Sequence, residues 1–375
     1  MNWSLVNMEE MIDTGLIRLG RGKVISKKDI NACPGQYPIY SSARLNDGKF
    51  GEYGNYMFDE ELITWSVDGG GSFFYRPKHR FSVTNVGGTL RVLDRNKVHY
   101  KYLYYVLSYK HSRLLFDWTS KAHPSVIRRL YTEIPLPPLA EQKRIAAILD
   151  AADALRAKRR ESLAELDRLL QSTFLDLFGD PVTNPKGWDR RTLGEITTIE
   201  AAMVDPRKEA YSQLLHYGPD RIEKDTGELL PAKTAEEDEL ISGKFLCSPG
   251  EILYSKIRPY LNKVALVKQP CLCSADVYPV RPNTEVLTKE YLLMLLRSAG
   301  FLDYVAGFSR RANIPKLNRK QFAGYNAPTP PINLQNHFAT IVESIERQKT
   351  RLRAHLAELD TLFASLQSRA FNGEL

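Results

Sequence analysis

Residues 135–178 read PLPPLAEQKRIAAILDAADALRAKRRESLAELDRLLQSTFLDLF, and residues 328–371 read PTPPINLQNHFATIVESIERQKTRLRAHLAELDTLFASLQSRAF. The two stretches align without a gap at a shift of 193 residues, and 15 of the 44 aligned positions are identical. The identities include three prolines and the whole run LAELD, at 163–167 and 356–360. Unrelated helices share Leu and Glu through composition, but rarely such a run in register together with a proline triplet. The sequence therefore predicts an internal duplication.

Each copy is predicted to form one long helix. Its paired prolines suit a first helical turn, and a glycine follows its last apolar residue as a stop signal. About 40 residues at 1.5 Å each make a rod of roughly 60 Å. Apolar residues at three- and four-residue spacing predict a seam between the two helices. The predicted seam residues are Ile145, Ile148, Leu155, Leu166 and Leu169 in the first copy, and Phe338, Ile341, Ile345, Leu352, Leu359 and Leu362 in the second.

The segments outside the two helices, 1–134 and 179–331, are similar in length and resemble each other weakly. Each has an apolar strand-like run and, later, a short strand followed by an apolar helix. The predicted fold is α+β, with two mixed α/β domains at 1–134 and 179–331 and two helical segments at 135–178 and 332–375. If the second domain is compact, the helices run antiparallel and the halves are related by an approximate two-fold axis. The alternative is two separate amphipathic helices, each covering its own domain.

Composition excludes several classes of protein. The chain has 375 residues, 43% of them hydrophobic, which indicates a folded protein with more than one domain. No stretch approaches 18 consecutive apolar residues and the start has no apolar signal region, so we expect a cytoplasmic protein without a membrane span. Four cysteines are too few for a disulfide scaffold. The net charge of +8 favours an acidic partner, and the first domain carries 19 basic against 13 acidic residues.

No catalytic or metal-binding residue is predicted. The glycine run at 69–71 is not followed by lysine, so there is no phosphate-binding loop, and no pair of histidines has the spacing of a zinc site. The pattern Asn/Asp-Pro-Pro-aromatic, expected of amino-methyltransferases, is absent as well. These absences favour a binding protein over an enzyme.

Four clusters of basic and planar side chains are predicted to contact DNA, because phosphates require cations and base edges require forked donors. They lie at 75–80 and 121–129 in the first domain, and at 256–263 and 309–320 in the second. The pairs are predicted to occupy corresponding places in the two domains. Each cluster could also be ordinary solvated charge in a loop. The candidate DNA contacts are Arg76, Lys78, Arg80, Lys121, His123, Lys256, Arg258, Tyr260, Lys263, Arg310, Arg311, Asn313 and Lys316.

Several motifs together resemble the specificity subunit of Type I restriction-modification enzymes. They are the run IPLPPLAEQKRIAAIL at 134–149, the LAELD helices, Gly187-Trp188 with Leu193-Gly194-Glu195-Ile196, and the ending FNGEL at 371–375. In the first domain, only Leu19-Gly20-Arg21 is a loose counterpart of Leu193-Gly194-Glu195. The resemblance covers essentially the whole chain.

The resemblance implies two target recognition domains, each reading one half of a bipartite site in double-stranded DNA. It implies that the helix pair acts as a spacer and docks two methyltransferase subunits, with restriction subunits joining that complex. AdoMet, ATP and magnesium would then be bound by the partner subunits, with no cofactor in this chain. Three alternatives remain open: a stand-alone DNA-binding regulator, a coiled-coil adaptor that does not touch DNA and, least favoured, a combined methyltransferase-nuclease.

Overall fold

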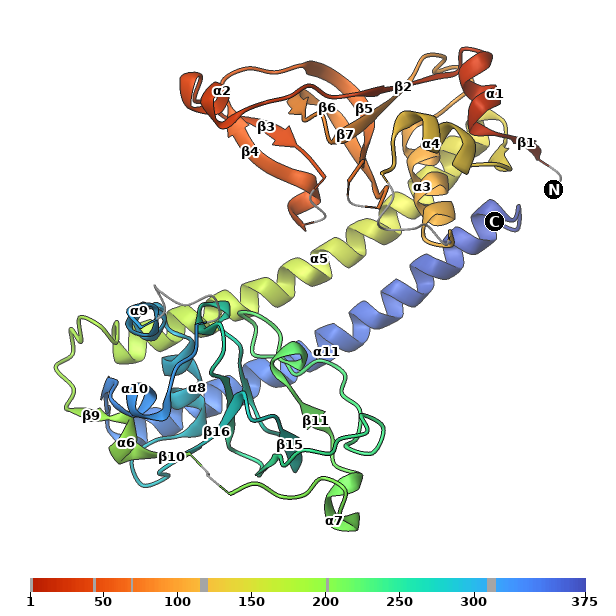
Figure 1. Ribbon diagram of the computed structural model, residues 1–375. Coiled ribbons are helices and arrows are strands. Elements are labelled where there is room, and N and C mark those ends of the chain that lie inside the picture. The colour runs from red at the N-terminus through yellow and green to blue at the C-terminus, as the bar shows by residue number, and fades with distance from the viewer. Residues whose placement is uncertain (1–2, 43–44, 69, 115–120, 200–201, 309–314) are drawn as a thin grey trace. The chain divides into compact units, whose positions relative to one another are not determined.

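The computed structural model describes residues 3–42, 45–68, 70–114, 121–199, 202–308 and 315–375. The chain forms two compact units, one of Met1–Arg160 with Ala354–Leu375 and one of Glu161–Arg353. Two long helices, α5 (Leu139–Phe178) and α11 (Ile332–Phe371), contribute part of their length to each unit (Figure 1). The two predicted helices are thus confirmed, and each runs unbroken for 40 residues.

The first unit is built on a six-stranded sheet in the order β2-β7-β5-β6-β3-β4. Its two longest strands, β5 and β6, pair antiparallel from Phe58↔Phe81 to Trp65↔Phe73. The elements outside the long helices are β1 (Ser4–Val6), α1 (Met8–Asp13), β2 (Ile17–Arg21), α2 (Lys27–Ala32), β3 (Tyr37–Tyr40), η1 (Leu45–Gly48), β4 (Lys49–Tyr53), β5 (Phe58–Ser66), β6 (Phe73–Val83), β7 (Gly87–Val92), α3 (Tyr100–His111), α4 (Pro124–Leu130) and β8 (Ile134–Leu136).

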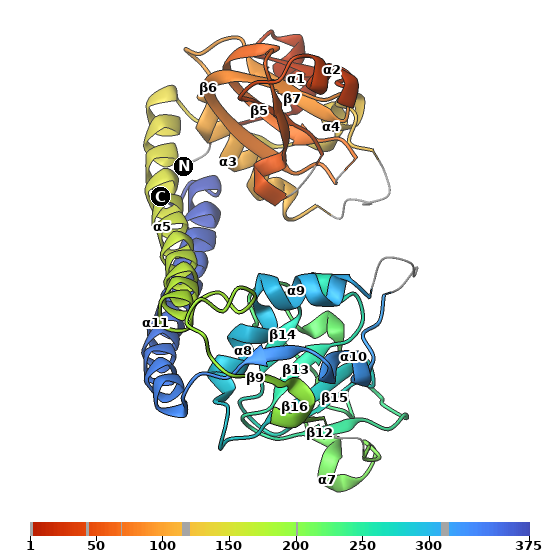
Figure 2. The same cartoon turned by 90° about the vertical axis from the view of Figure 1, so that its left-hand side faces the viewer.

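The second unit has a four-stranded sheet in the order β10-β16-β13-β14 and a smaller one in the order β11-β15-β12 (Figure 2). Its elements are β9 (Arg190–Thr192), α6 (Leu193–Ile196), β10 (Thr197–Ile199), α7 (Glu209–Ser212), β11 (His216–Tyr217), η2 (Pro219–Arg221), β12 (Phe245–Cys247), β13 (Ile252–Ser255), η3 (Pro259–Leu261), β14 (Val264–Leu266), β15 (Cys271–Cys273), β16 (Val277–Pro282), α8 (Lys289–Arg297), α9 (Ala299–Ala306), α10 (Arg319–Ala323) and β17 (Asn326–Pro328).

The duplication extends from the helices to the domains. Strands β2, β7, β5 and β6 of the first unit follow the same order as β10, β16, β13 and β14 of the second. In each unit an apolar helix, α3 or α8, comes after the strand β7 or β16. Each unit also has a two-stranded ladder, β1 with β8 in the first and β9 with β17 in the second. The strands β8 and β17 come directly before the long helices α5 and α11. The two mixed α/β domains are therefore built alike.

The counterpart of Leu193-Gly194-Glu195 in the first unit is Met8-Glu9-Glu10, which corrects the match to Leu19-Gly20-Arg21. Both tripeptides open a short helix directly after the ladder strand. The side chain of Asn7 accepts a hydrogen bond from the Glu10 amide, as Thr192 caps the helix that contains Glu195. Leu19, by contrast, lies inside strand β2. The features that the two segments share are a tryptophan five residues before the helix, Trp3 or Trp188, and the capping residue. In the first unit both lie before Leu19, so a match on Leu-Gly alone failed.

One buried glutamine per unit ties the long helix to its domain. The side-chain amide of Gln142 donates to the carbonyl oxygens of Lys97 and Pro137, both at 2.8 Å, and its oxygen accepts from the His99 amide at 2.8 Å. Gln335 makes the same three bonds in the second unit, with the carbonyl oxygens of Val286 and Pro330 and the amide of Thr288, at 2.7–2.9 Å. Both glutamines are fully buried. Their identity in the two copies therefore has a structural cause.

Within each unit the two helices pack side by side and antiparallel. In the first unit Arg144 of α5 donates to the terminal residue Leu375, while Arg156 bonds Asp360 of α11. In the second unit Phe178 lies against Phe338, with ring centroids 5.4 Å apart. Such apolar side chains join each domain core, where each contributes about 1.5–3 kcal/mol by burial.

The seam is one residue out of phase with the predicted one at several positions. Leu155, Leu169 and Leu362 are 52%, 51% and 48% exposed, so their assignment to the seam was wrong. Ile148 and Ile341 lie at its margin and are half-buried. The seam positions with buried or half-buried side chains are Ile145, Leu149, Ala152, Arg156, Leu163, Leu166 and Leu170 in α5, and Phe338, Val342, Ile345, Lys349, Leu352, Leu356, Leu359 and Phe363 in α11.

A cation in each seam explains the error, because the prediction placed only apolar residues there. Arg156 bonds Asp153 on its own helix and Asp360 on the facing one, at 2.7 and 2.6 Å. Lys349 bonds Glu346 at 2.9 Å and Asp167 at 2.8 Å. All three positions of one triad correspond to those of the other at the shift of 193 residues. Paired carboxylates thus make a buried cation tolerable in an otherwise apolar contact.

Replacing Lys349 with methionine is expected to lower the free energy of unfolding of the second unit by about 2 kcal/mol, because Asp167 then loses its cation and Glu346 keeps only Arg353, at 3.8 Å. Burial disfavours the charged ammonium, but its bonds to the two carboxylates outweigh this and raise the pKa of Lys349 above 10.5. Its stabilising effect is therefore complete below pH 10.5 and is lost as the pH rises through the raised value. Urea denaturation at pH 8 and 11 measures both effects.

The matched control is Arg347→Met, which removes an exposed cation from the same helix. It should leave unfolding unchanged at both pH values. Equal losses in the two variants would contradict a special role for the buried ammonium.

Candidate nucleic-acid interface

The first predicted cluster lies along strand β6, in its exposed middle part. Lys78 and Arg80 are exposed, and Arg80 bonds Asp59 at 3.3 Å and the Tyr37 hydroxyl at 3.2 Å. The Arg80 guanidinium also lies 5.0 Å from the ring centre of Tyr56. Both cations can therefore reach an external ligand from one end of β6.

Arg76 is removed from the candidate DNA contacts, because its side chain is only 4% exposed. Its guanidinium bonds the Thr64 hydroxyl at 3.0 Å and the carbonyl oxygen of Asp47, and it stacks 3.6 Å above the ring of Tyr40. Burial lowers the pKa of Arg76 to about 10. The pairing of β6 with β5 shifts register between Arg76 and His79, and this irregularity separates the buried Arg76 from the exposed Lys78 and Arg80.

The second cluster of the first unit lies beside the β5–β6 turn. The Ala122 amide donates to the carbonyl oxygen of Val67 at 2.8 Å, which brings Lys121 within 3.6 Å of Asp68. The Lys121 side chain remains 62% exposed. His123 is half-buried and precedes the first turn of α4 without capping it through its side chain. Of the two predicted contacts in this cluster, Lys121 is the more exposed.

In the second unit two predicted clusters come together. The Arg258 amide donates to the carbonyl oxygen of Pro315, and the Leu317 amide donates to that of Lys256, both at 2.8 Å. Lys256 and Lys316 then share one carboxylate oxygen of Asp276, at 3.8 and 3.6 Å.

Exposed planar groups accompany these cations. Arg258 is exposed in a left-handed conformation with φ of 46°, and Tyr260 is 55% exposed in the η3 turn. Lys263 is turned away, because its ammonium bonds the carbonyl oxygen of Pro219 at 2.5 Å. A forked donor, an aromatic face and two half-neutralised cations form a surface able to meet both bases and phosphates.

The predicted correspondence of the clusters holds for one pair and fails for the other. Lys121 and Lys316 are equivalent, because the next residue of each donates its amide to the chain just after β5 or β13. The cluster at 75–80, however, lies in a strand, whereas 256–263 forms the connection between β13 and β14. The true counterpart of that connection is the β5–β6 turn at 67–72. Arg310, Arg311 and Asn313 lie outside the described residues.

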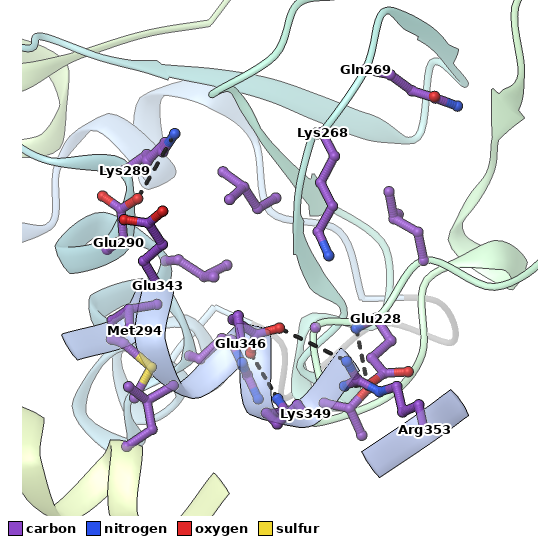
Figure 3. Close-up of a pocket in the computed structure, with 18 of the residues that line it drawn as sticks. Glu228, Lys268, Gln269, Lys289, Glu290, Met294, Glu343, Glu346, Lys349 and Arg353 are labelled. Atoms are coloured by element: carbon purple, nitrogen blue, oxygen red, sulfur yellow. Dashed lines mark hydrogen bonds and ion pairs between the residues drawn. The ribbon is translucent and has the colours of Figure 1, made fainter. Parts of the chain in front are cut away.

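A cavity of about 500 Å³ lies in the second unit between α8, α11 and the segment around Gly227 (Figure 3). Its walls carry Lys289 beside Glu290 and, on α11, Glu346 bonded to Lys349. Arg353 pairs with Glu228 across it. These six charges are paired, whereas Lys268 and Glu343 also line the cavity and have no ion pair with a described residue.

Within the described ranges no group of three or more His, Cys, Asp or Glu residues could hold a metal ion. No helix among these residues has both the length and the apolar character to cross a membrane.

Comparison with known proteins assigns the family. The model of the Type I restriction modification DNA specificity domain matches this chain twice, over residues 2–167 and 185–359. The chain belongs to this family. The two matches coincide with the two copies of domain and helix described above, so the resemblance to a Type I specificity subunit is confirmed.

Relatives of this specificity subunit cover its whole length or part of it. The chain is 25% identical over 417 residues to the specificity subunit of the Type I restriction enzyme EcoDI from Escherichia coli, covering all of this chain and 89% of that protein. A putative type I specificity subunit of Mycoplasma pneumoniae, S.MpnORF285P, is 34% identical over 37% of this chain and 46% of its own length. The crystal structure of a Type I S subunit from M. genitalium shares the fold with a TM-score of 0.59 at 18% identity, covering 99% and 96% of the two chains.

Proposed function

We propose that this chain is the DNA-recognition subunit of a Type I restriction-modification complex, in which each domain reads one half of a bipartite target. Duplicated domains with exposed basic surfaces support this proposal, since two similar modules suit two half-sites. The unbroken helices α5 and α11, shared by both units, would set the distance between the half-sites. The chain would have no catalytic role, and AdoMet, ATP and magnesium would be bound by the partner subunits.

The docking of two partners is supported by residues that are identical in the two helices although they are exposed. Packing explains why Leu166 equals Leu359, because both lie in the seam. It does not explain identity at positions that face solvent. The identical exposed pairs are Ala164/Ala357, Glu165/Glu358, Leu169/Leu362 and Ser172/Ser365. Two equal external surfaces suit two copies of one partner, and we propose methyltransferase subunits as that partner and restriction subunits as further components.

Co-expression with a Type I methyltransferase subunit tests this proposal. The wild-type chain should purify with two methyltransferase copies. The complex should bind duplex DNA that contains the sequence it methylates. Leu169→Glu or Leu362→Glu should each remove one copy, and the double variant should remove both, because a buried unpaired carboxylate opposes docking. Native mass spectrometry counts the copies.

Leu155→Glu is the matched control, since Leu155 is equally exposed but aligns with Gln348 rather than with a leucine. It should retain both partners. A chain that binds its DNA target alone and never associates with a methyltransferase would instead be a stand-alone regulator, and the proposal would be wrong.

A further inference from the structure

A hollow of about 680 Å³ in the first unit lies outside all the clusters predicted from sequence. It lies between the edge strand β2 and the segment from Tyr53 to Phe58. Arg18, Arg21 and Lys23 stand along its β2 side, and Tyr56 stands on the other. The hollow therefore combines cations with an aromatic wall.

The cations of this hollow are largely unneutralised. Arg18 and Lys23 are exposed, and their side chains make no hydrogen bond or ion pair with any described residue. Arg21 bonds only a neutral group, the carbonyl oxygen of Asn85, at 2.5 and 3.1 Å. The exception is Arg91, which pairs with Glu60 at 2.5 Å. No carboxylate is among the described residues that line the hollow, so it attracts anions.

The geometry of the strand favours a phosphate over a base edge as the ligand. β2 has a strand partner on one side only, so no neighbouring strand covers its outer edge. Gly20 lies in its middle, where an added Cβ would come within 2.9 Å of the Thr89 hydroxyl, and this keeps the floor of the hollow free of a side chain. Arg80, stacked near Tyr56, continues the positive surface beyond the hollow.

Among its described residues, the second unit shows no equivalent hollow beside β10. Its corresponding strand β10 (Thr197–Ile199) carries no charged residue, and a glutamate follows it in the sequence. The difference agrees with the charges of the domains, since the first has 19 basic and 13 acidic residues and 179–331 has 21 and 19.

We propose that this hollow binds phosphates of the DNA backbone and that it anchors the first domain independently of sequence, with no matching anchor in the second. The inference rests on the proposed role in DNA recognition. Phosphate contacts fix the position of a protein on the duplex without reading bases, whereas base contacts distinguish sequences. The two kinds of contact therefore respond differently to mutation.

The test is DNA binding by the full chain carrying Arg18→Gln and Lys23→Gln, measured by fluorescence anisotropy from 50 to 300 mM NaCl. Affinity should fall on the order of tenfold at 150 mM salt, equally for target and non-target duplexes. The slope of log K against log salt should become less steep by roughly 2. Arg21 is left unchanged in this variant, because its guanidinium donates to the carbonyl oxygen of Asn85.

Lys27→Gln with Lys28→Gln is the matched control, because it removes two exposed charges from helix α2 of the same domain outside the hollow. It should leave affinity and slope nearly unchanged. The inference is overturned if both double variants lose affinity equally, or if the loss is confined to the target sequence. The charge-preserving variant Arg18→Lys with Lys23→Arg should bind DNA as the wild-type chain does. If the wild-type chain shows no salt-dependent DNA binding, the proposed function itself fails, which distinguishes the two failures.

Discussion

A chain with four residues inserted after Arg160 and four after Arg353 is expected to bind a target whose half-sites lie about one to two base pairs farther apart. Four helical residues add about 6 Å and rotate the helix by about 40° beyond one turn. One base pair adds 3.4 Å and roughly 35° of rotation. Affinity for the original target should fall on the order of a thousandfold, toward non-specific binding.

Insertion in both helices matters because each unit pairs one part of α5 with one part of α11. The two insertion points are equivalent at the shift of 193 residues and fall at the boundary between the units. The seam inside each unit therefore keeps its register. Alanine-rich inserts keep the helices continuous.

Methylome sequencing or binding to a library of spacer lengths would read out this result. The sequences of both half-sites should stay the same, because neither domain is changed. A chain that keeps its original spacer, or that changes its half-site bases, would show that the helix pair does not set the distance. Substituting Ala157 and Lys158, which are both exposed, without a change of length is the control.

Gln335→Leu is expected to lower the free energy of unfolding by about 3–5 kcal/mol. The change leaves the carbonyl oxygens of Val286 and Pro330 and the amide of Thr288 buried without partners, at about 1–3 kcal/mol for each group. Leucine has nearly the volume of glutamine, so the loss comes from hydrogen bonding and not from a cavity.

Urea denaturation followed by circular dichroism would measure this loss. Gln142→Leu should produce the same destabilisation in the first unit, because its three bonds are equivalent. Gln348→Leu, at an exposed position of the same helix as Gln335, should change stability by less than about 0.5 kcal/mol. A similar loss in Gln348→Leu would refute the proposed cause.

Much of the fold follows from local pattern in the sequence. A proline pair, a heptad repeat and a terminal glycine specify a long helix without long-range information, and the duplication shows that it occurs twice. The same pattern could not place the seam correctly, because Leu155 and Arg156 are adjacent and periodicity favours the leucine. Asp153 and Asp360 make the arginine acceptable, and one of these carboxylates is on the facing helix.

The candidate interface was predicted less well than the fold. Basic clusters were visible in the sequence, but charge does not show on which side of a strand it lies, and Arg76 points inward. The residues Arg18, Arg21 and Lys23 were missed because each is separated from the next by apolar or small residues. A count of charges along 17–23, where three of seven residues are basic and none is acidic, could have found them.

The duplicated helices, the two α/β domains and the membership of a DNA-specificity family could all be read from the order of residues, because they depend on neighbours along the chain. The phase of the seam, the burial of Arg76, the joining of Lys256 with Lys316 and the basic hollow beside β2 required the folded chain. Each of these depends on groups far apart in sequence, and their energies arise only when folding removes water and brings charges within a few ångströms of each other.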